Sequence, residues 1–203
     1  VQDVEKGFSD HLWDEPWQTD TCLGDWFYNV ARLNDRNYKT AEEVMQRLAD
    51  VVSKNGNLLL SVPQPGDGSI DSEEEKILDG MTSWVAINGE AIFGSRPWRI
   101  YGEGPTKLAG GMQNESSAKP FTARDIRFTT NKGALYALFL APPRGPATIA
   151  SLATGRGREE IERVTLLGGD TVRHRRDAAG LHLDLPRDTG FVPAVRIEGR
   201  GLV

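Results

Sequence analysis

Apolar side chains recur at helical spacing after residue 40, at Val44, Leu48, Val51 and Val52. The Thr40-Ala-Glu-Glu43 segment before them has the capping-box pattern of a helix start, and Asn55-Gly56 supplies a helix stop. This pattern predicts an amphipathic helix between the two signals.

A short, nearly continuous apolar run, Asn57-Leu-Leu-Leu-Ser-Val62, comes next. Such a run is typical of a strand that is buried on both faces of a parallel sheet. A loop rich in Pro and Gly (residues 63–68) ends it, and Ser72-Glu-Glu-Glu75 has the pattern of a second helix cap. We expect this second helix to end at Asn88-Gly89. Its apolar face comprises Ile77, Leu78, Met81, Trp84 and Val85. The three acidic residues Glu73, Glu74 and Glu75 suit the positive end of its dipole.

Beyond Trp98 the apolar pattern changes to an alternation with a period of two. Residues 125–130 and 134–141 flank Asn131-Lys132-Gly133 and predict a hairpin. Further short strands are expected at residues 147–152, 161–167, 181–185 and 194–198. Residues 102–120, rich in Gly, Ser, Asn and Lys, predict a long loop or a flexible edge.

These patterns predict an α/β region followed by an all-β region. Residues 1–98 have the order of the last units of a (β/α)8-like barrel, and residues 99–203 have that of an antiparallel β-sandwich. Charge supports a boundary near Trp98: the first region holds 18 acidic and 8 basic side chains, and the second holds 11 and 16.

The basic second region raises the alternative of nucleic-acid binding. Its arginines are scattered through predicted loops and strand edges, without the interleaved aromatic residues of single-strand binders. We therefore expect no nucleic-acid partner.

Composition narrows the class of protein further. The 203 residues contain one cysteine, Cys22, which excludes an internal disulfide and is expected to be a buried structural thiol. No apolar run approaches the roughly 20 residues that span a bilayer. The chain lacks an initial Met, and we expect it to start partway through a longer protein. His11, His174 and His182 show no ligand spacing, so neither a metal nor a cofactor is predicted.

Four segments occur together in the order of a known family. They are Pro16-Trp-Gln-Thr-Asp-Thr-Cys-Leu-Gly-Asp-Trp26, Asp50-Val-Val-Ser-Lys-Asn-Gly-Asn-Leu-Leu-Leu60, Gly66-Asp-Gly-Ser-Ile70 and Asn88-Gly-Glu-Ala-Ile-Phe-Gly-Ser-Arg-Pro-Trp98. With them, most of the chain resembles the α-L-fucosidases of glycoside hydrolase family 29. The resemblance implies the end of a catalytic barrel in residues 1–98 and the family's carboxy-terminal sandwich in residues 99–203.

Enzymes of this family are retaining glycosidases that use two carboxylates, a nucleophile and an acid/base. The resemblance implies that the nucleophilic Asp lies upstream of Val1, and that this chain alone is inactive. Glu5 has the spacing of the acid/base from the aromatic Trp26-Phe-Tyr motif. Asp3 and Glu15 are weaker alternatives for this role, and an ordinary solvated Glu5 beside Lys6 is the plain alternative.

Aromatic residues near Glu5 are candidates for contact with the sugar. By resemblance, Trp26 lies against the apolar face of fucose, while Trp13 and Trp17 flank the same loop and could line the pocket mouth. Packing in the core is the alternative for each of the three. The chain has Gln18 where many relatives have Glu, and Phe27 where many have Gly.

The resulting hypothesis is a fragment of an enzyme that hydrolyses α-linked L-fucose from oligosaccharides or glycoconjugates without a cofactor. Two alternatives stay open: a carbohydrate-binding or interaction module without catalysis, and a retaining glycosidase of another specificity. We expect a fucosylated carbohydrate as substrate. An uncovered barrel edge would require a second copy of the chain or the missing amino-terminal part as partner. By resemblance, a periplasmic or secreted location is favoured over a cytoplasmic one.

Overall fold

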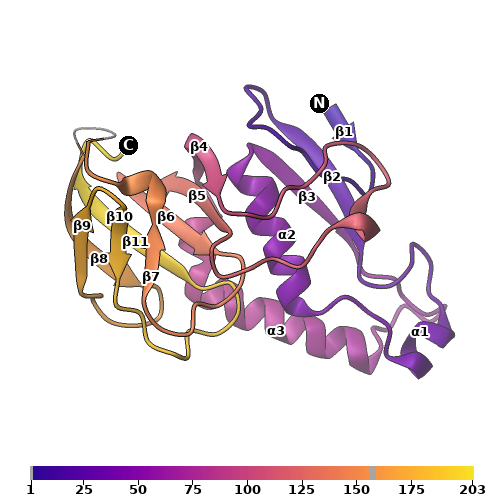
Figure 1. Cartoon of the computed structure of the whole chain (residues 1–203). Coiled ribbons are helices and arrows are strands. Elements are labelled where there is room, and N and C mark those ends of the chain that lie inside the picture. The colour runs from indigo at the N-terminus through magenta and orange to yellow at the C-terminus, as the bar shows by residue number, and fades with distance from the viewer. Residues whose placement is uncertain (1, 156–158) are drawn as a thin grey trace.

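A parallel sheet, a pair of helices and two antiparallel sheets lie one behind another in the computed structural model (Figure 1), which describes residues 2–155 and 159–203. The parallel sheet has the order β1-β2-β3 and contains β1 (Gln2–Val4), β2 (Trp17–Cys22) and β3 (Gly56–Ser61). The pair of helices is α2 (Ala41–Ser53) and α3 (Ser72–Asn88), and a short helix, α1 (Val30–Asp35), follows β2.

The antiparallel part contains a five-stranded sheet of order β4-β5-β6-β11-β8 and a three-stranded sheet of order β7-β10-β9. The larger sheet comprises β4 (Arg96–Glu103), β5 (Ile126–Asn131), β6 (Ala134–Phe139), β8 (Glu160–Leu166) and β11 (Ala194–Arg200). The smaller one comprises β7 (Ala147–Ile149), β9 (His174–Asp177) and β10 (Gly180–Leu183). Short 3₁₀ turns occur at Gly89–Ala91, Glu115–Ser117 and Ala150–Leu152.

The five-stranded sheet has a hydrophobic core on each face. On one face, Phe128 and Ile197 pack with Leu181 and Leu183 of the smaller sheet, as expected for a β-sandwich. On the other face, Tyr136 and its neighbours pack with residues of α2 and α3 such as Met45 and Trp84. Residues before and after 98 therefore share a core, and the division into two domains at that point stays a prediction.

Most predicted elements are present, and the capping signals explain where the helices start. Thr40 and Glu43 form the expected reciprocal capping box of α2. In α3 the prediction was wrong by one residue: Asp71, not Ser72, is the cap, and its carboxylate accepts the N–H groups of Glu73 and Glu74.

The predicted hairpin is β5–β6. Its two-residue turn places Lys132 at a φ of 48° and Gly133 at 76°, the left-handed values that a tight type I′ turn needs. Strands β1, β4 and β9 and helix α1 were not predicted. The helices of the described residues are too short or too polar to cross a bilayer.

Strand β3 differs from its predicted burial on both faces. Leu58 and Leu60 pack toward the helices, but Leu59 between them is 55% exposed and Asn57 is also exposed. β3 pairs only with β2, so one face and one edge of this strand are uncovered in the chain.

A buried ionic cluster joins α2 to the five-stranded sheet. Asp50 on α2 is within 2.8 Å of Lys54 Nζ and 2.6 Å of Arg127 Nε on β5, and all three side chains are at most 4% exposed. Burial by itself would raise the pKa of Asp50, but the two cations outweigh it and hold that pKa below its ordinary value. The Lys54 ammonium also donates to the carbonyl of Ser9 at 2.6 Å.

We expect Asp50→Asn to lower the free energy of unfolding by about 3–5 kcal/mol, because it leaves two buried cations without their counter-charge. Urea denaturation of the purified protein measures the change. Asp79→Asn, at an exposed position of α3, is the matched control and should change it by less than about 0.5 kcal/mol. Equal effects of the two substitutions would contradict a structural role of the cluster.

Glu74 in the first turn of α3 is buried rather than solvated. Neither carboxylate oxygen has a hydrogen-bond partner among the described residues. Burial, reinforced by the nearby Asp71 carboxylate, raises the pKa of Glu74 from its ordinary 4.5 to about 7. The folded state therefore holds this proton more tightly than the unfolded state does.

That difference predicts a loss of stability as the pH rises from about 4.5 through about 7. Glu74→Gln removes the ionisation, so at pH 8 the variant should be more stable than wild type by about 1–3 kcal/mol, with little difference at pH 4. Thermal unfolding across this pH range measures it, with the exposed Glu75→Gln as control. A constant difference at all pH values would refute the assignment.

Candidate active site

The carboxyl ends of the three parallel strands lie at one edge of their sheet (Figure 1). Glu5 follows the end of β1 at once, and Trp26 comes four residues after the end of β2. Parallel α/β sheets bind their ligands at this edge. Glu5 is exposed and Trp26 is 36% exposed, so both side chains are open to a ligand.

Lys6 ties the turn that carries Glu5 to the second strand. Its backbone takes a left-handed φ of 43°, and its N–H donates to Asp20 Oδ1 at 2.8 Å. Its ammonium group lies 4.8 Å from the centre of the Trp26 ring, a cation–π contact. The structure thus brings Glu5, Asp20 and Trp26 into one neighbourhood.

Arg47 of α2 holds the same turn from the helix side of the sheet. Its guanidinium donates to the carbonyls of Gly7 at 2.8 Å and Asp20 at 3.2 Å. The side chain is 4% exposed. Burial lowers the pKa of Arg47, and the carboxylate of Glu115 opposes this by favouring the charged form.

The loop after β2 is held by Asp25. Arg32 donates to both carboxylate oxygens of Asp25 at 2.7 and 3.1 Å, and Asn29 donates at 2.9 Å. These hydrogen bonds, that of Arg32 foremost, lower the pKa of Asp25 to about 2. Asp25 is therefore ionised near neutrality and unsuited to donate a proton, although it neighbours Trp26. Phe27, on the same loop, is 85% exposed.

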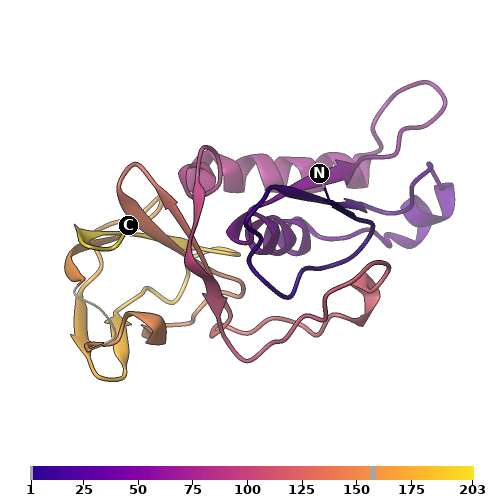
Figure 2. The same cartoon turned by 90° about the horizontal axis from the view of Figure 1, so that it is seen from above.

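A long excursion from the five-stranded sheet reaches the turn of Glu5. Residues 104–120, here called the strap, leave β4, cross toward β1 and β2, and return to β5 (Figures 1 and 2). Phe8 and Gly111 exchange two backbone hydrogen bonds of 3.2 and 3.0 Å. The N–H of Gln113 donates to the carbonyl of Glu5 at 2.9 Å.

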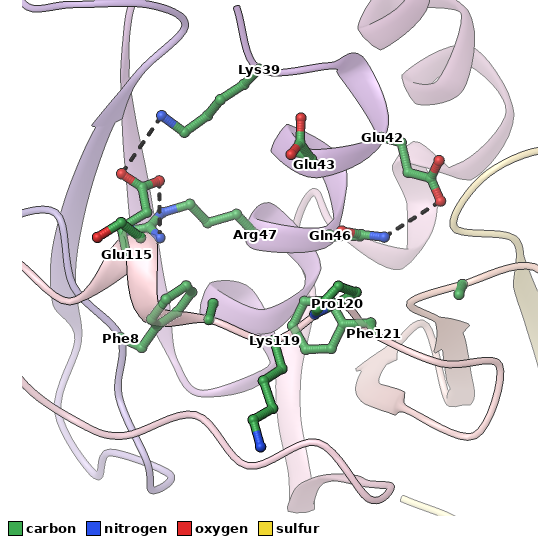
Figure 3. Close-up of a pocket in the computed structure, with 13 residues that line it drawn as sticks. Phe8, Lys39, Glu42, Glu43, Gln46, Arg47, Glu115, Lys119, Pro120 and Phe121 are labelled. Atoms are coloured by element: carbon green, nitrogen blue, oxygen red, sulfur yellow. Dashed lines mark hydrogen bonds and ion pairs between the residues drawn. The ribbon is translucent and has the colours of Figure 1, made fainter.

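Between the strap and α2 lies a pocket of about 640 Å³ (Figure 3). Phe8 and Phe121 give it apolar walls, and Glu115 points toward Arg47 and Lys39. Neither Glu5 nor Trp26 lines this pocket. It lies on the helix side of the sheet, because Thr21, which contacts Glu115, shares that side with the helix-facing Thr19.

Trp13 and Trp17 lie at the other edge of the parallel sheet. Trp17 starts β2, has no exposed surface, and donates its indole N–H to the carbonyl of Lys54 at 2.9 Å. Trp13 stacks on it with ring centres 6.0 Å apart. The structure does not bring these two rings to Glu5, so their predicted contact with substrate has no structural support.

The remaining candidates are placed as follows. Asp3, an alternative to Glu5, is exposed on β1 with Gln18 Nε2 at 3.4 Å from its Oδ1, and Glu15 is exposed just before β2 begins. Cys22 is a buried free thiol, as predicted, and lies 3.1 Å from the carbonyl of Gly24. Within residues 2–155 and 159–203, no cluster of His, Cys, Asp and Glu could hold a metal ion.

Comparisons with known proteins connect this geometry to a family. The sequence model described as alpha-L-fucosidase matches residues 1–90. Human tissue alpha-L-fucosidase is 29% identical over 178 residues, which are 86% of this chain and 34% of that protein. Human plasma alpha-L-fucosidase is 37% identical over 92 residues, or 44% of this chain and 19% of that protein. Residues 1–90 thus match the α-L-fucosidase family, and most of the chain is similar to its members.

Solved structures of α-L-fucosidases share the fold of the chain. The Thermotoga maritima α-fucosidase in complex with a mechanism-based inhibitor superimposes with a TM-score of 0.71 and 25% identity, over 92% of this chain and 40% of that one. The α-L-fucosidase isoenzyme 1 from Paenibacillus thiaminolyticus superimposes with a TM-score of 0.73 and 22% identity, over 98% of this chain and 44% of that one. The chain thus spans less than half the length of the fucosidases it matches.

Two residues near the candidate site were not singled out from the sequence. Asp20 could have been found from the alternation along β2, since Thr19 and Thr21 face α2 and Asp20 must face away. Glu115 carried no such signal, because it lies 94 residues from its partner Thr21 in a segment of loop composition.

The contact between strap and turn depends on a glycine. A Cβ on Gly7 would lie 1.9 Å from the carbonyl oxygen of Gly111. We therefore expect Gly7→Ala to displace the strap and to speed tryptic cleavage at its exposed Lys107 at least tenfold. Gly66→Ala is the control, because nothing lies within 4 Å of a Cβ there. Unchanged cleavage in Gly7→Ala would show that the strap is not held at this point.

Proposed function

We propose that this chain is the carboxy-terminal part of a retaining α-L-fucosidase, with Glu5 as the acid/base and the nucleophile in a preceding part of the same protein. The match of residues 1–90 to the α-L-fucosidase family supports the activity, and the exposed Glu5 at the carboxyl end of β1 carries the site assignment. The substrate is an α-L-fucoside of an oligosaccharide or glycoconjugate, and no cofactor takes part.

The uncovered sheet supports the proposal that more barrel precedes this chain. Parallel sheets normally have both faces covered. Here β1 and β3 are both edge strands, and Leu59 is 55% exposed on the face away from α2. Further strands of a (β/α)8 barrel would pair these edges and enclose that face. The 203 residues alone are then inactive, because they lack the nucleophile.

Two carboxylates share the reaction in a retaining glycosidase. Glu5 donates its proton to the leaving oxygen while the nucleophile attacks the anomeric carbon, which gives a fucosyl-enzyme. Glu5, now ionised, takes a proton from the water that cleaves this intermediate. Asp25 is a poor substitute, because its lowered pKa of about 2 leaves it without a proton to donate.

Trp26 supplies the surface on which the sugar lies. Its ring is 36% exposed and is held in place by Lys6 at 4.8 Å, next to the turn of Glu5. A flat apolar ring suits the C–H face and methyl group of fucose. Trp13 and Trp17 take no part in this proposal, because they lie at the amino ends of the strands.

Hydrolysis of an aryl α-L-fucoside by the longer protein tests the proposal. Glu5→Ala should lower kcat for hydrolysis by about 10²–10⁴-fold, since it removes the proton transfer of both steps. Azide needs no general base and should accelerate the variant. Because azide attacks the fucosyl-enzyme on the face that the leaving group vacated, the product should be the α-fucosyl azide.

Controls separate Glu5 from its alternatives. Glu15→Ala, at the amino end of β2, should keep wild-type activity, and Asp3→Ala should show no azide rescue. A β-fucosyl azide from Glu5→Ala would make Glu5 the nucleophile instead. Full activity of Glu5→Ala would place the acid elsewhere, and an inactive wild type would exclude a fucosidase.

A further inference from the structure

The connection from β1 to β2 lacks the helix that usually links parallel strands. Residues 5–16 cross between the strands without one, although parallel neighbours are normally joined through a helix that covers the sheet. The strap lies on this uncovered stretch: it pairs with Phe8, and its Glu115 reaches Thr21 on the helix side of β2. A segment of the sandwich region thus occupies the place of a barrel helix (Figure 2).

We propose that Glu115 is a positioning residue for the acid/base: through the strap, it fixes the turn that presents Glu5, so that the sandwich region takes part in proton transfer. This inference rests on the proposed role of Glu5. It concerns a residue outside the barrel that does not itself contact the sugar.

The strap holds the backbone that directly follows Glu5. The N–H of Gln113 donates to the carbonyl of Glu5 at 2.9 Å, and the N–H of Glu115 donates to the carbonyl of Lys6 at 3.1 Å. These two hydrogen bonds fix consecutive peptide groups of the turn. The direction in which the Glu5 side chain leaves the backbone is therefore set by the strap.

The Glu115 carboxylate anchors the strap to the α/β region. Thr21 Oγ1 donates to its Oε1 at 2.6 Å, Arg47 Nη1 lies 3.3 Å from the same oxygen, and Lys39 Nζ lies 3.6 Å from Oε2 (Figure 3). One carboxylate therefore joins β2, α2 and the segment before α2. Since 19% of its side chain is exposed and that of Arg47 is 4% exposed, the pair is well shielded from water.

Arg47 links the Glu115 carboxylate to the turn that carries Glu5. It pairs with Glu115 on one side and donates to the Gly7 carbonyl on the other, while its guanidinium lies 4.6 Å from the Phe8 ring. Without the Glu115 charge, the buried Arg47 guanidinium would lack its counter-charge. Its rearrangement toward other acceptors would shift the turn that it holds. A displacement of about 1 Å at a catalytic group can cost about 10²-fold in rate.

A misplaced acid affects substrates unequally, and this difference tests the inference. Glu115→Gln in the longer protein should lower kcat/KM about tenfold to a hundredfold for a methoxyphenyl α-L-fucoside, whose poor leaving group needs the proton. For a dinitrophenyl fucoside, which departs without protonation, the loss should stay below about threefold. A merely structural defect would lower both values alike.

Glu42→Gln is the matched control. Glu42 lines the same pocket and contacts Gln46 at 3.4 Å, away from the turn (Figure 3), and its variant should behave as wild type with both substrates. If Glu115→Gln does not fold, Thr21→Val replaces it, because this variant removes only the hydroxyl that donates to Glu115. The ratio of its activity losses on the two fucosides then tests the positioning role.

Glu5→Ala in the same assay distinguishes a failure of the positioning role of Glu115 from a failure of the acid/base assignment. Suppose that Glu5→Ala shows the leaving-group dependence, while Glu115→Gln either shows none or loses activity equally on both substrates. The positioning role is then refuted and the proposed function stands. If Glu5→Ala itself lacks this dependence, the acid/base assignment fails. The positioning role is supported when Glu5→Ala and Glu115→Gln both show the leaving-group dependence and Glu42→Gln does not.

Discussion

The buried carboxylate of Asp50, held between Lys54 and Arg127, is the interaction on which the rest of the structure depends. It lies on α2, which has a sheet on either side, and Arg127 extends to it from the five-stranded sheet. A charge this deep is tolerable only with partners of excellent geometry. The relative placement of α2 and the antiparallel sheet is therefore tightly constrained.

The polar stripe of α2 also explains how a helix-free connection stays ordered. Arg47 and Asp50 of α2 and Lys54, which caps its end, lie on one side of the helix, and the two basic residues donate to the carbonyls of Gly7 and Ser9. The backbone of residues 5–16 has no crossover helix beside it, and buried polar groups need partners. The helix side chains and the strap supply them. The candidate acid/base Glu5 thus stands on a turn that three separate parts of the chain hold.

The sequence predicted the elements whose signals are local. The capping box at Thr40 and Glu43 starts α2, and Asn131-Lys132-Gly133 makes the β5–β6 hairpin, because both depend on neighbours within a few residues. Strands β1, β4 and β9 were missed. The first and last are three and four residues long, and β4 has a register shift in its pairing with β5, which breaks the alternation.

Local sequence signals also do not identify the residues of the candidate site. Glu5 and Trp26 could be selected through a family resemblance, but nothing local distinguishes Trp26 from Trp17. One follows a parallel strand and the other begins it, and only the fold shows that these positions lie at opposite edges of the sheet. Likewise, Glu115 is an unremarkable loop residue until the chain brings it to Thr21.

By itself, then, the sequence determined helices α2 and α3, the β5–β6 hairpin, the change from α/β to all-β near Trp98, and the resemblance to a family. Periodicity and capping depend on residues only a few positions apart, so they form the same local structure whatever the rest of the chain does. The tertiary structure alone decided which side chains share a site: that Glu74 and Asp50 are buried, and that a strap from the second region reaches the turn of Glu5. Those outcomes depend on desolvation and on contacts between residues far apart in the chain, which no local pattern encodes.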